Sequence, residues 1–446
     1  MKKTVLTLAT IMAFGWQGIS FADSSVDALI QKLQDKGILT SQEASQLKDE
    51  VSTKEETTQK ATFKSMLPSW ISGIKIGGDF RLRDQIQRTK KPTGGTGNDA
   101  RNRGRLRARL NLEDQINDKV KFDVTLATEG GSDNGQLNNS RSNNWTFGGN
   151  GSTGSGSFSK PYIALDKAYV TYTPNKMVTL LGGKMANPIW EPASLLWDPD
   201  ITPEGGAILL SKRLSDLVTP FSTNAFFVLK DSGPSSSQRT DPYVFVTQEG
   251  IKGNLTDKVF YQAAAQGHFF SNAGHVPLDN GAGSVGNTLT SGGLYAYGYS
   301  LVGGAINIGM NDPFGDMLPN PIYIPQIGIF GEYNQNMDVS NKNTSWDAGW
   351  YMGNSAINGW GTWKISSFYK VLAADSVPDA IPSDDFYSGD TDTRGWQNEI
   401  DIGLAKNVWF DMLYYHTNVY KPIASITNLS SNAPEDIFQI DMNFKF

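Results

Sequence analysis

Apolar and polar residues alternate strictly along the segment from Glu435 to Phe446. One face carries five apolar side chains and the other carries four polar ones: Phe438, Ile440, Met442, Phe444 and Phe446 against Gln439, Asp441, Asn443 and Lys445. A period of two is the period of a β-strand, whose successive side chains point to opposite faces. The pattern predicts an amphipathic strand that ends on an aromatic residue.

The same period of two recurs along the chain from about residue 73. We predict strands at 73–88, 101–114, 119–129, 164–174, 177–186, 206–214, 221–231, 242–252, 258–269, 295–308, 321–334, 345–355, 359–372, 394–404, 407–418 and 435–446. The connections alternate between short turns, such as 116–118, and long Gly-, Ser- and Asn-rich loops, such as 130–163. Short turns at one edge and long loops at the other are typical of an up-and-down transmembrane barrel. The prediction is an all-β antiparallel barrel of about 16 strands over residues 73–446, and 14 or 18 strands also fit.

A different period marks the segment before the strands. Apolar residues between Val26 and Val51 recur every three or four positions, which is helical periodicity. Gly37 interrupts the pattern, and Thr40 with Glu43 forms a capping box that begins a second helix. Residues 23–52 are therefore predicted to form a short helical pair or interrupted coiled coil in the periplasm. A polar tether, residues 53–72, would join it to the barrel.

The first 22 residues have the layout of a secretory signal peptide. Lys2 and Lys3 precede an apolar stretch from Val5 to Trp16, and Ser20-Phe21-Ala22 offers a small-x-small cleavage site. Cleavage would remove two positive charges and change the formal net charge from −6 to −8. The chain has no cysteine, which excludes a lipoprotein anchor and any disulfide or cysteine-based metal site.

Composition favours a membrane barrel over a soluble β-protein, although it does not decide alone. The chain holds 46 Gly, 22 Phe, 16 Tyr and 11 Trp, yet its mean hydropathy of −0.36 is that of a soluble protein. A barrel explains this combination because only every second strand residue faces lipid. No run of about 18 apolar residues follows the signal peptide, so no transmembrane helix is expected.

Basic residues occupy alternate positions on three successive predicted strands. They are Arg81 and Arg83, then Arg101, Arg103, Arg105, Arg107 and Arg109, then Lys119 and Lys121. An arginine facing lipid at the bilayer midplane costs about 2–4 kcal/mol, so this face should line the lumen. Guanidinium groups pair with carboxylate or phosphate, and a positive stripe along the pore would favour anions. We add Lys184 on the fifth strand as a further pore-lining candidate.

The connection after the fifth strand carries a matching set of acids. Glu191, Asp198, Asp200 and Glu204 lie there among Trp and Pro residues, which suggests an ordered loop. We predict that this loop folds into the barrel and faces the basic wall. A transverse field across the constriction would then orient charged solutes. The alternative is that the arginines only neutralise these loop acids and serve the structure.

The signal peptide, helical segment, polar tether, about 16 strands, acidic third loop and terminal Phe446 together resemble the outer-membrane porins with an N-terminal periplasmic coiled coil, the DcaP-like dicarboxylate porins. The resemblance implies a homotrimer, stapled in the periplasm by its helices, that passes small anionic solutes. Gly37 departs from an uninterrupted coiled coil, so a tether to the cell wall or to a periplasmic partner is an alternative role for residues 23–52. Phosphate-selective porins also have arginine-lined lumens and remain a second alternative.

No motif indicates an enzyme or a cofactor. We predict no catalytic residue, metal site, cofactor or nucleic-acid partner, and no phosphate-binding Gly-rich loop lies between a strand and a helix. The expected surroundings are outer-membrane lipid and lipopolysaccharide of a Gram-negative bacterium, with the N-terminal segment in the periplasm.

Overall fold

In a computed structural model of the protein, the described residues are 73–90, 98–129, 140–148, 160–231, 241–275, 278, 286–317, 323–420 and 434–446. The chain divides into two units, Met1–Gly73 and Ile74–Phe446. The predicted signal peptide, helical segment and tether lie outside the described residues. Every strand of the described residues belongs to the second unit.

Sixteen long strands make up this unit, as the period of two predicted. They are β1 (Lys75–Lys90), β2 (Asn98–Asn117), β3 (Val120–Thr128), β5 (Ile163–Asn175), β6 (Val178–Lys184), β7 (Glu204–Ser211), β8 (Thr219–Val228), β9 (Tyr243–Asn254), β10 (Val259–Ser271), β11 (Tyr299–Asn311), β12 (Gln326–Asn336), β13 (Thr344–Gly353), β14 (Trp363–Leu372), β15 (Thr393–Ala405), β16 (Val408–Val419) and β17 (Glu435–Lys445). The two-residue β4 (Trp145–Thr146), which was not predicted, pairs with β2. Short 3-10 turns such as Tyr387–Gly389 lie in the connections.

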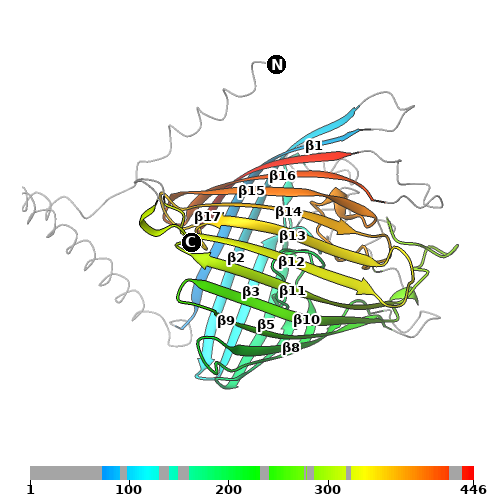
Figure 1. The fold of residues 1–446 in the computed structure, drawn as a ribbon. Helices are drawn as coiled ribbons and strands as arrows, with labels where there is room; N and C mark the ends of the chain where they lie inside the picture. The colour runs from blue at the N-terminus through cyan, green and yellow to red at the C-terminus, as the bar shows by residue number, and fades with distance from the viewer. Residues whose placement is uncertain are drawn as a thin grey trace, which may run out of the picture. The chain divides into compact units, whose positions relative to one another are not determined.

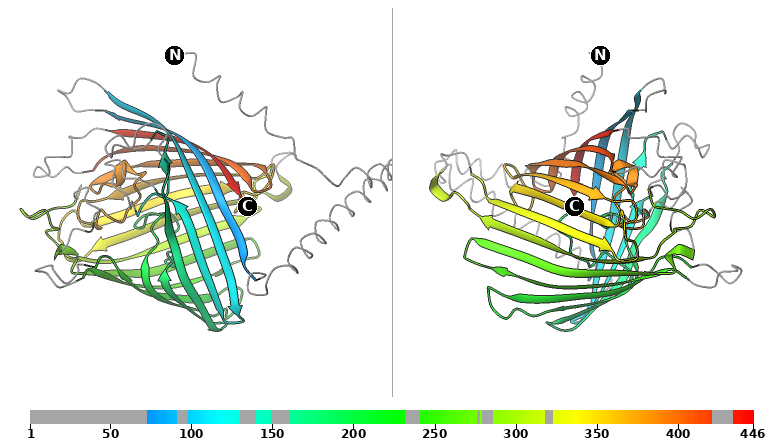
Figure 2. Two further views of the ribbon diagram at one scale, coloured as in Figure 1. Left: turned by 180° about the vertical axis from the view of Figure 1, so that it is seen from behind. Right: turned by 45° about the vertical axis from the view of Figure 1, so that its right-hand side comes forward.

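The strands close into a barrel because β1 pairs with both β2 and β17. Each long strand is antiparallel to the long strands on either side, in chain order around the sheet. Figures 1 and 2 show the ring of strands, with the blue β1 beside the red β17. The prediction of an antiparallel barrel of about 16 strands is confirmed.

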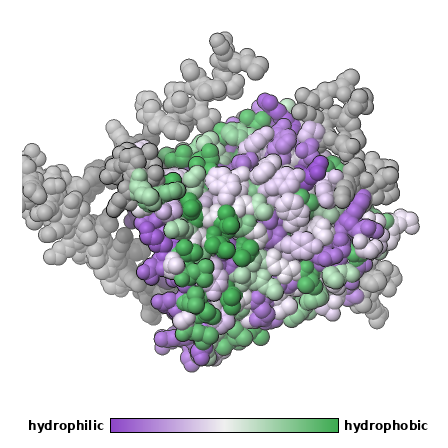
Figure 3. Space-filling view, viewed as in Figure 1, coloured by the Kyte–Doolittle hydropathy of each residue, from purple (hydrophilic) through white to green (hydrophobic). Residues whose placement is uncertain are grey.

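Burial within the strands is the reverse of that in a soluble protein. On β17, Gln439 and Asp441 are 0% and 1% exposed, whereas Phe444 is 36% exposed. On this strand most inward side chains are polar and most outward ones are apolar, as a lipid environment requires. On the face that Figure 3 shows, hydrophobic residues gather across the middle of the strands and hydrophilic residues lie toward the strand ends.

The connections differ in length at the two edges of the barrel. At the edge that holds both ends of the sheet, most are short, such as 118–119, 176–177 and 406–407. Those at the other edge include 129–162, 185–203, 272–298 and 373–392, which we call the second, third, fifth and seventh loops. The rule has exceptions, since 312–325 is long and both 91–97 and 337–343 are short. Among the described residues, no helix has the length and apolar character needed to span a bilayer.

Candidate pore constriction

The pairing of β1 with β2 gathers the predicted arginines on one inner wall. Arg81 lies opposite Arg107, and Arg83 lies opposite Arg105. Like charges directly across a strand pair destabilise a sheet. We call Arg81, Arg83, Arg103, Arg105, Arg107 and Arg109 the arginine wall, and its stability depends on the partners of these side chains.

Arg83 is the most fully paired residue of the arginine wall. Its Nε and Nη2 donate to the two carboxylate oxygens of Asp441 on β17, both at 2.8 Å. Its Nη1 lies 3.1 Å from a carboxylate oxygen of Asp385 in the seventh loop. Charge-assisted bidentate pairs of this kind are among the strongest hydrogen bonds in proteins. Arg83 therefore joins the wall, the last strand and a loop.

Asp79 on β1 pairs with two residues of the arginine wall, Arg107 and Arg109. It accepts hydrogen bonds from Arg107 Nε and Nη2 at 3.1 and 2.9 Å, and from Arg109 Nε at 2.8 Å. Asp200 of the third loop stands farther away, 3.9 Å from Nη1 of both arginines. These two guanidinium groups thus have one close carboxylate and one looser one.

Other members of the wall bond to neutral groups. Arg105 donates to the Gln85 side chain at 3.0 Å and to Ser142 Oγ at 3.3 Å. Arg81 donates to Asn144 Oδ1 at 2.5 Å, and its nearest carboxylate, that of Asp441, is 3.6 Å away. Arg103 donates to Gln87 at 3.0 Å. Amide and hydroxyl partners satisfy donors without cancelling their charge.

The third loop packs against the inside of the barrel. Its Leu195, Leu196 and Trp197 are 0%, 1% and 5% exposed. They belong to one apolar cluster with inward-facing residues of β7–β11: Ala207, Ala225, Phe227, Val244, Val246, Phe270, Tyr299 and Leu301. Trp197 Nε1 also donates to His268 Nε2 at 3.2 Å. Apolar burial and this hydrogen bond hold the loop inside the lumen.

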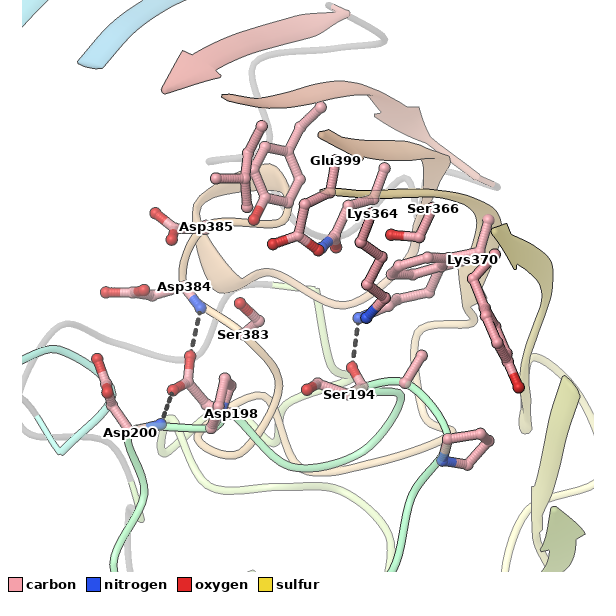
Figure 4. A pocket seen from close by; sticks show the side chains of 18 of the residues that line it. Ser194, Asp198, Asp200, Lys364, Ser366, Lys370, Ser383, Asp384, Asp385 and Glu399 are labelled. Carbon is pink, nitrogen blue, oxygen red and sulfur yellow. Dashed lines mark hydrogen bonds between the residues drawn. The ribbon is translucent and has the colours of Figure 1, made fainter. Parts of the chain in front are cut away.

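The seventh loop, which the sequence pattern did not predict to fold inward, meets the third loop in the lumen. The backbone N–H of Asp384 donates to Asp198 Oδ2 at 3.1 Å, and that of Asp198 donates to the carbonyl of Ile381 at 2.9 Å. Figure 4 shows Asp198, Asp200, Asp384 and Asp385 on these two loops, with Lys370 of β14 bonded to the backbone of Ser194. The two loops therefore face the arginine wall together.

A cavity of about 640 Å³ lies between the arginine wall and the loops. Charged residues of both signs line it. The basic ones are Arg81, Arg83, Arg107, Arg109, Arg141, Lys364 and Lys370, and the acidic ones are Asp198, Asp200, Asp384, Asp385 and Glu399. The cavity is therefore lined by acidic and basic side chains at close range.

The loop acids differ in their affinity for protons. Burial and the neighbouring Asp385 raise the pKa of Asp384 to about 7. Burial, then the charge of Asp384, raises the pKa of Asp198 well above its ordinary value. Burial also opposes ionisation of Asp385, but Arg83, Arg105 and Arg81 outweigh it and hold the pKa of that carboxyl below its usual range. At neutral pH and below, the loops therefore carry less negative charge than their acid count suggests.

The structure does not place Lys184 and Glu204 in the cavity or beside the arginine wall. Their side chains form a 3.0 Å ion pair and are 31% and 65% exposed. The register places Lys184 opposite Ala168 and Glu204, in the outward phase of Val170 and Ile208. The assignment of Lys184 to the pore lining and of Glu204 to the constriction is therefore corrected, because the strand alternation points both outward.

Arg103 and Arg105 of the arginine wall do not line the cavity, and four further predicted residues lie away from it. Arg101 is exposed on the part of β2 that pairs with β1 alone, and Lys119 is exposed in the β2–β3 turn. Lys121 bonds Glu113 and Asp123 at 3.0 and 3.1 Å beside that turn. Glu191 belongs to the third loop, is half-buried near Glu332, Asp347 and Lys370, and accepts a 3.4 Å hydrogen bond from the backbone of Trp197.

The wall's acidic partners were visible in the sequence but were not assigned. Asp79 stands in the same alternation as Arg81, and Asp441 lies on the polar face of the last strand. Arg141 and the Asp384-Asp385 pair lie in loops, where no period reveals their direction. Among the described residues, no group of His, Asp or Glu could hold a metal ion.

Two solved porin structures are similar to this chain, and the first of them has the same fold. OprB of Pseudomonas putida aligns over 89% of this chain and 97% of its own, with a TM-score of 0.50 and 9% identity. A triple mutant of the Rhodopseudomonas blastica porin aligns over 84% of this chain and 100% of its own, with a TM-score of 0.41 and 11% identity. No curated protein matches the sequence.

A closed antiparallel barrel with a polar, charged lumen and an apolar outer surface defines a passive-diffusion channel of the outer membrane. The family model described as "Putative porin" matches residues 87–277 and 318–446, more than two thirds of the chain. The chain belongs to this porin family, which confirms the predicted outer-membrane porin and points to a channel rather than an enzyme.

Proposed function

We propose that the barrel is an anion-preferring pore for small hydrophilic solutes, with carboxylates or similar anions as its preferred cargo. The observation that carries this proposal is the balance at the arginine wall. Arg81, Arg107 and Arg109 line the cavity, whereas Asp79 is the one carboxylate that the described residues bring within 3.5 Å of any of the three. The wall therefore keeps an excess of positive charge on the side that faces the solute path.

Guanidinium groups suit a pore that must bind and release. A carboxylate or phosphate that enters loses part of its hydration and accepts hydrogen bonds from several donors in turn. Conduction needs binding that is favourable enough for entry yet weak enough for exit, which several equivalent donors along a strand provide. Asp200, at 3.9 Å from two wall arginines, is the counter-charge that an anion would displace most easily.

Block of chloride current tests the proposal at the level of the solute. Succinate, acetate and phosphate are added to the purified protein in a planar bilayer, and the Arg107→Ser/Arg109→Ser variant is compared with the wild type. We expect the multivalent anions to block the wild type more strongly than acetate, and this block to weaken in the variant. Equal block of both proteins would contradict the proposal, and a preference for phosphate would favour the phosphate-selective alternative.

Several features of the whole assembly remain predictions. We infer cleavage after residue 22, a periplasmic helical segment at 23–52, a tether at 53–72 and a homotrimer in lipid and lipopolysaccharide. Light scattering of the purified protein tests the trimer, and the mass of a single chain would contradict it. Deletion of residues 23–52 separates the two roles of this segment. Loss of the trimer would support the staple, and loss of retention by the cell wall with the trimer intact would support the tether.

A further inference from the structure

The seventh loop (373–392) is buried to an extent that surface loops do not show. Ala374, Ser376, Thr391 and Asp392 are 0% exposed, and Val377 and Phe386 are 1% exposed. Loops normally run over the surface because their backbone polar groups need water. This loop must instead find its partners inside the barrel.

The seventh loop reaches both sides of the lumen. Val377 and Ile381 belong to the apolar cluster that also holds Leu195 and Trp197 of the third loop. Phe386 and Tyr387 belong to a second cluster with inward-facing residues of the opposite wall: Leu413, Tyr415, Val419 and Ile437. The loop therefore crosses the pore rather than lying along one wall.

Arg141 of the second loop bonds to the backbone of the seventh loop at three residues. Its Nη1 donates to the carbonyl oxygens of Asp379, Pro382 and Gly389 at 2.8, 3.1 and 3.2 Å. Gly389 has a φ of +85°, and a Cβ there would lie 2.6 Å from Arg141 Nη1. The glycine thus allows the guanidinium group to approach the backbone of the loop.

The fifth loop holds the first half of the seventh loop from another direction. Asn287 donates to the carbonyls of Ala374 and Val377 at 2.5 and 2.9 Å and accepts from the N–H of Asp379 at 2.9 Å. Tyr295 Oη donates to Asp379 Oδ1 at 2.6 Å. These contacts satisfy buried backbone groups, which is the condition for a stable buried loop.

The tip of the loop, Ser383 to Asp385, points at the arginine wall. Asp385 lies 3.1 Å from Arg83 Nη1 and accepts a 2.8 Å hydrogen bond from Gln439 of β17. We propose that the seventh loop is a second constriction element, positioned by Arg141, whose Asp385 sets how much of the charge of Arg83 a solute meets. Arg141 is then a positioning residue and Asp385 a selectivity-determining residue of the pore.

This inference rests on the proposed channel and extends it, since the third loop alone would leave the side of the lumen near β16 and β17 open. In this arrangement, the width of the pore and its ion selectivity depend on different residues. Loss of Arg141 loosens the loop and widens the pore. Loss of the Asp385 charge leaves the loop in place and exposes Arg83 to the solute.

The test is single-channel conductance and zero-current potential of full-length variants in planar bilayers. We expect Arg141→Gln to raise the conductance, Gly389→Ala to do so as well, and Arg141→Lys to fall between Arg141→Gln and the wild type. Asp385→Asn should shift the zero-current potential toward anions while the conductance changes less. Arg213→Gln, an exposed arginine in the β7–β8 turn paired with Asp216, is the control and should match the wild type.

Circular dichroism first establishes that each variant has the barrel fold. Wild-type conductance in both Arg141→Gln and Gly389→Ala would overturn the inference. If the conductance rises in these two variants but the wild type shows no anion preference, the seventh-loop constriction is supported and the proposed function is contradicted. If the conductance of these variants is unchanged but the anion preference of the wild type depends on the wall arginines, the seventh-loop constriction alone is contradicted.

Discussion

On β1 and β2, wall arginines repeat at every second residue because the pleat of a strand turns alternate side chains to one face. In the third and seventh loops, the acids that face them follow no period, and their positions come from apolar packing and backbone hydrogen bonds. Strands thus hold the positive side of the pore rigidly, while loops hold the negative side through contacts that can be lost one by one. We expect changes of charge, on the wall or at the loop acids, to alter selectivity, and changes in the packing or backbone contacts of the loops to alter width.

Arg83 joins the two regions, so its replacement should have the largest effect. Arg83→Met leaves the carboxylates of Asp441 and Asp385 without their buried partner, and breaking such a pair costs about 3–5 kcal/mol. Denaturant unfolding in lipid vesicles measures the loss. The exposed Arg88→Met on the same strand is the control, and a loss no larger than that of the control would contradict the pairing.

Weaker packing of the third loop should have the second largest effect. Leu195 is fully buried against the inner wall, and Leu195→Ala should cost about 2–5 kcal/mol of loop packing. We expect a larger and noisier single-channel conductance with little change in ion preference. Leu214→Ala, at a leucine 62% exposed in a turn, is the matched control. A shift in ion preference without a change in conductance would contradict the role of this apolar packing in setting the pore width.

The loop acids also predict a pH dependence. Because the pKa of Asp384 is raised to about 7, its carboxyl is neutral below that pH and gains a negative charge above it. Anion preference should therefore weaken as the pH rises from about 6 to about 8, and this part of the change should disappear in Asp384→Asn. Zero-current potentials at the two pH values measure it. A stronger anion preference at the higher pH would contradict the assignment.

The smallest effect is expected at the outer carboxylate of the constriction. Asp200 lies 3.9 Å from Arg107 and Arg109, and such loose, partly solvated pairs contribute about 0–1 kcal/mol. Asp200→Asn should move the zero-current potential slightly toward anions. Glu204→Gln, four residues along the chain but in the outward phase, should leave it unchanged, and equal shifts in the two variants would contradict the placement of both residues.

The strands could be predicted from the sequence because their signal is local. The alternation in β2 and β17 is enough to assign faces, and it also separates Arg105 from Leu106. It is harder to interpret at the ends of β6 and β7, where Gly182, Gly183, Gly205 and Gly206 carry no side chain to mark the two faces. Lys184 and Glu204 there point outward. The direction of a loop depends on partners far along the chain, as with Arg141 and Gly389 or Arg83 and Asp385. No local pattern contains that information.

The most direct test of the arginine wall is the zero-current potential under a salt gradient, measured for the wild type and for Arg81→Ser/Arg107→Ser/Arg109→Ser. We predict anion preference in the wild type and its loss or reversal in the variant, because Asp79 and Asp200 would then face the pore without their partners. Cation preference in the wild type, or equal potentials in the two proteins, would mean that the arginines only balance the lumen acids and would contradict the arginine wall as the selectivity element.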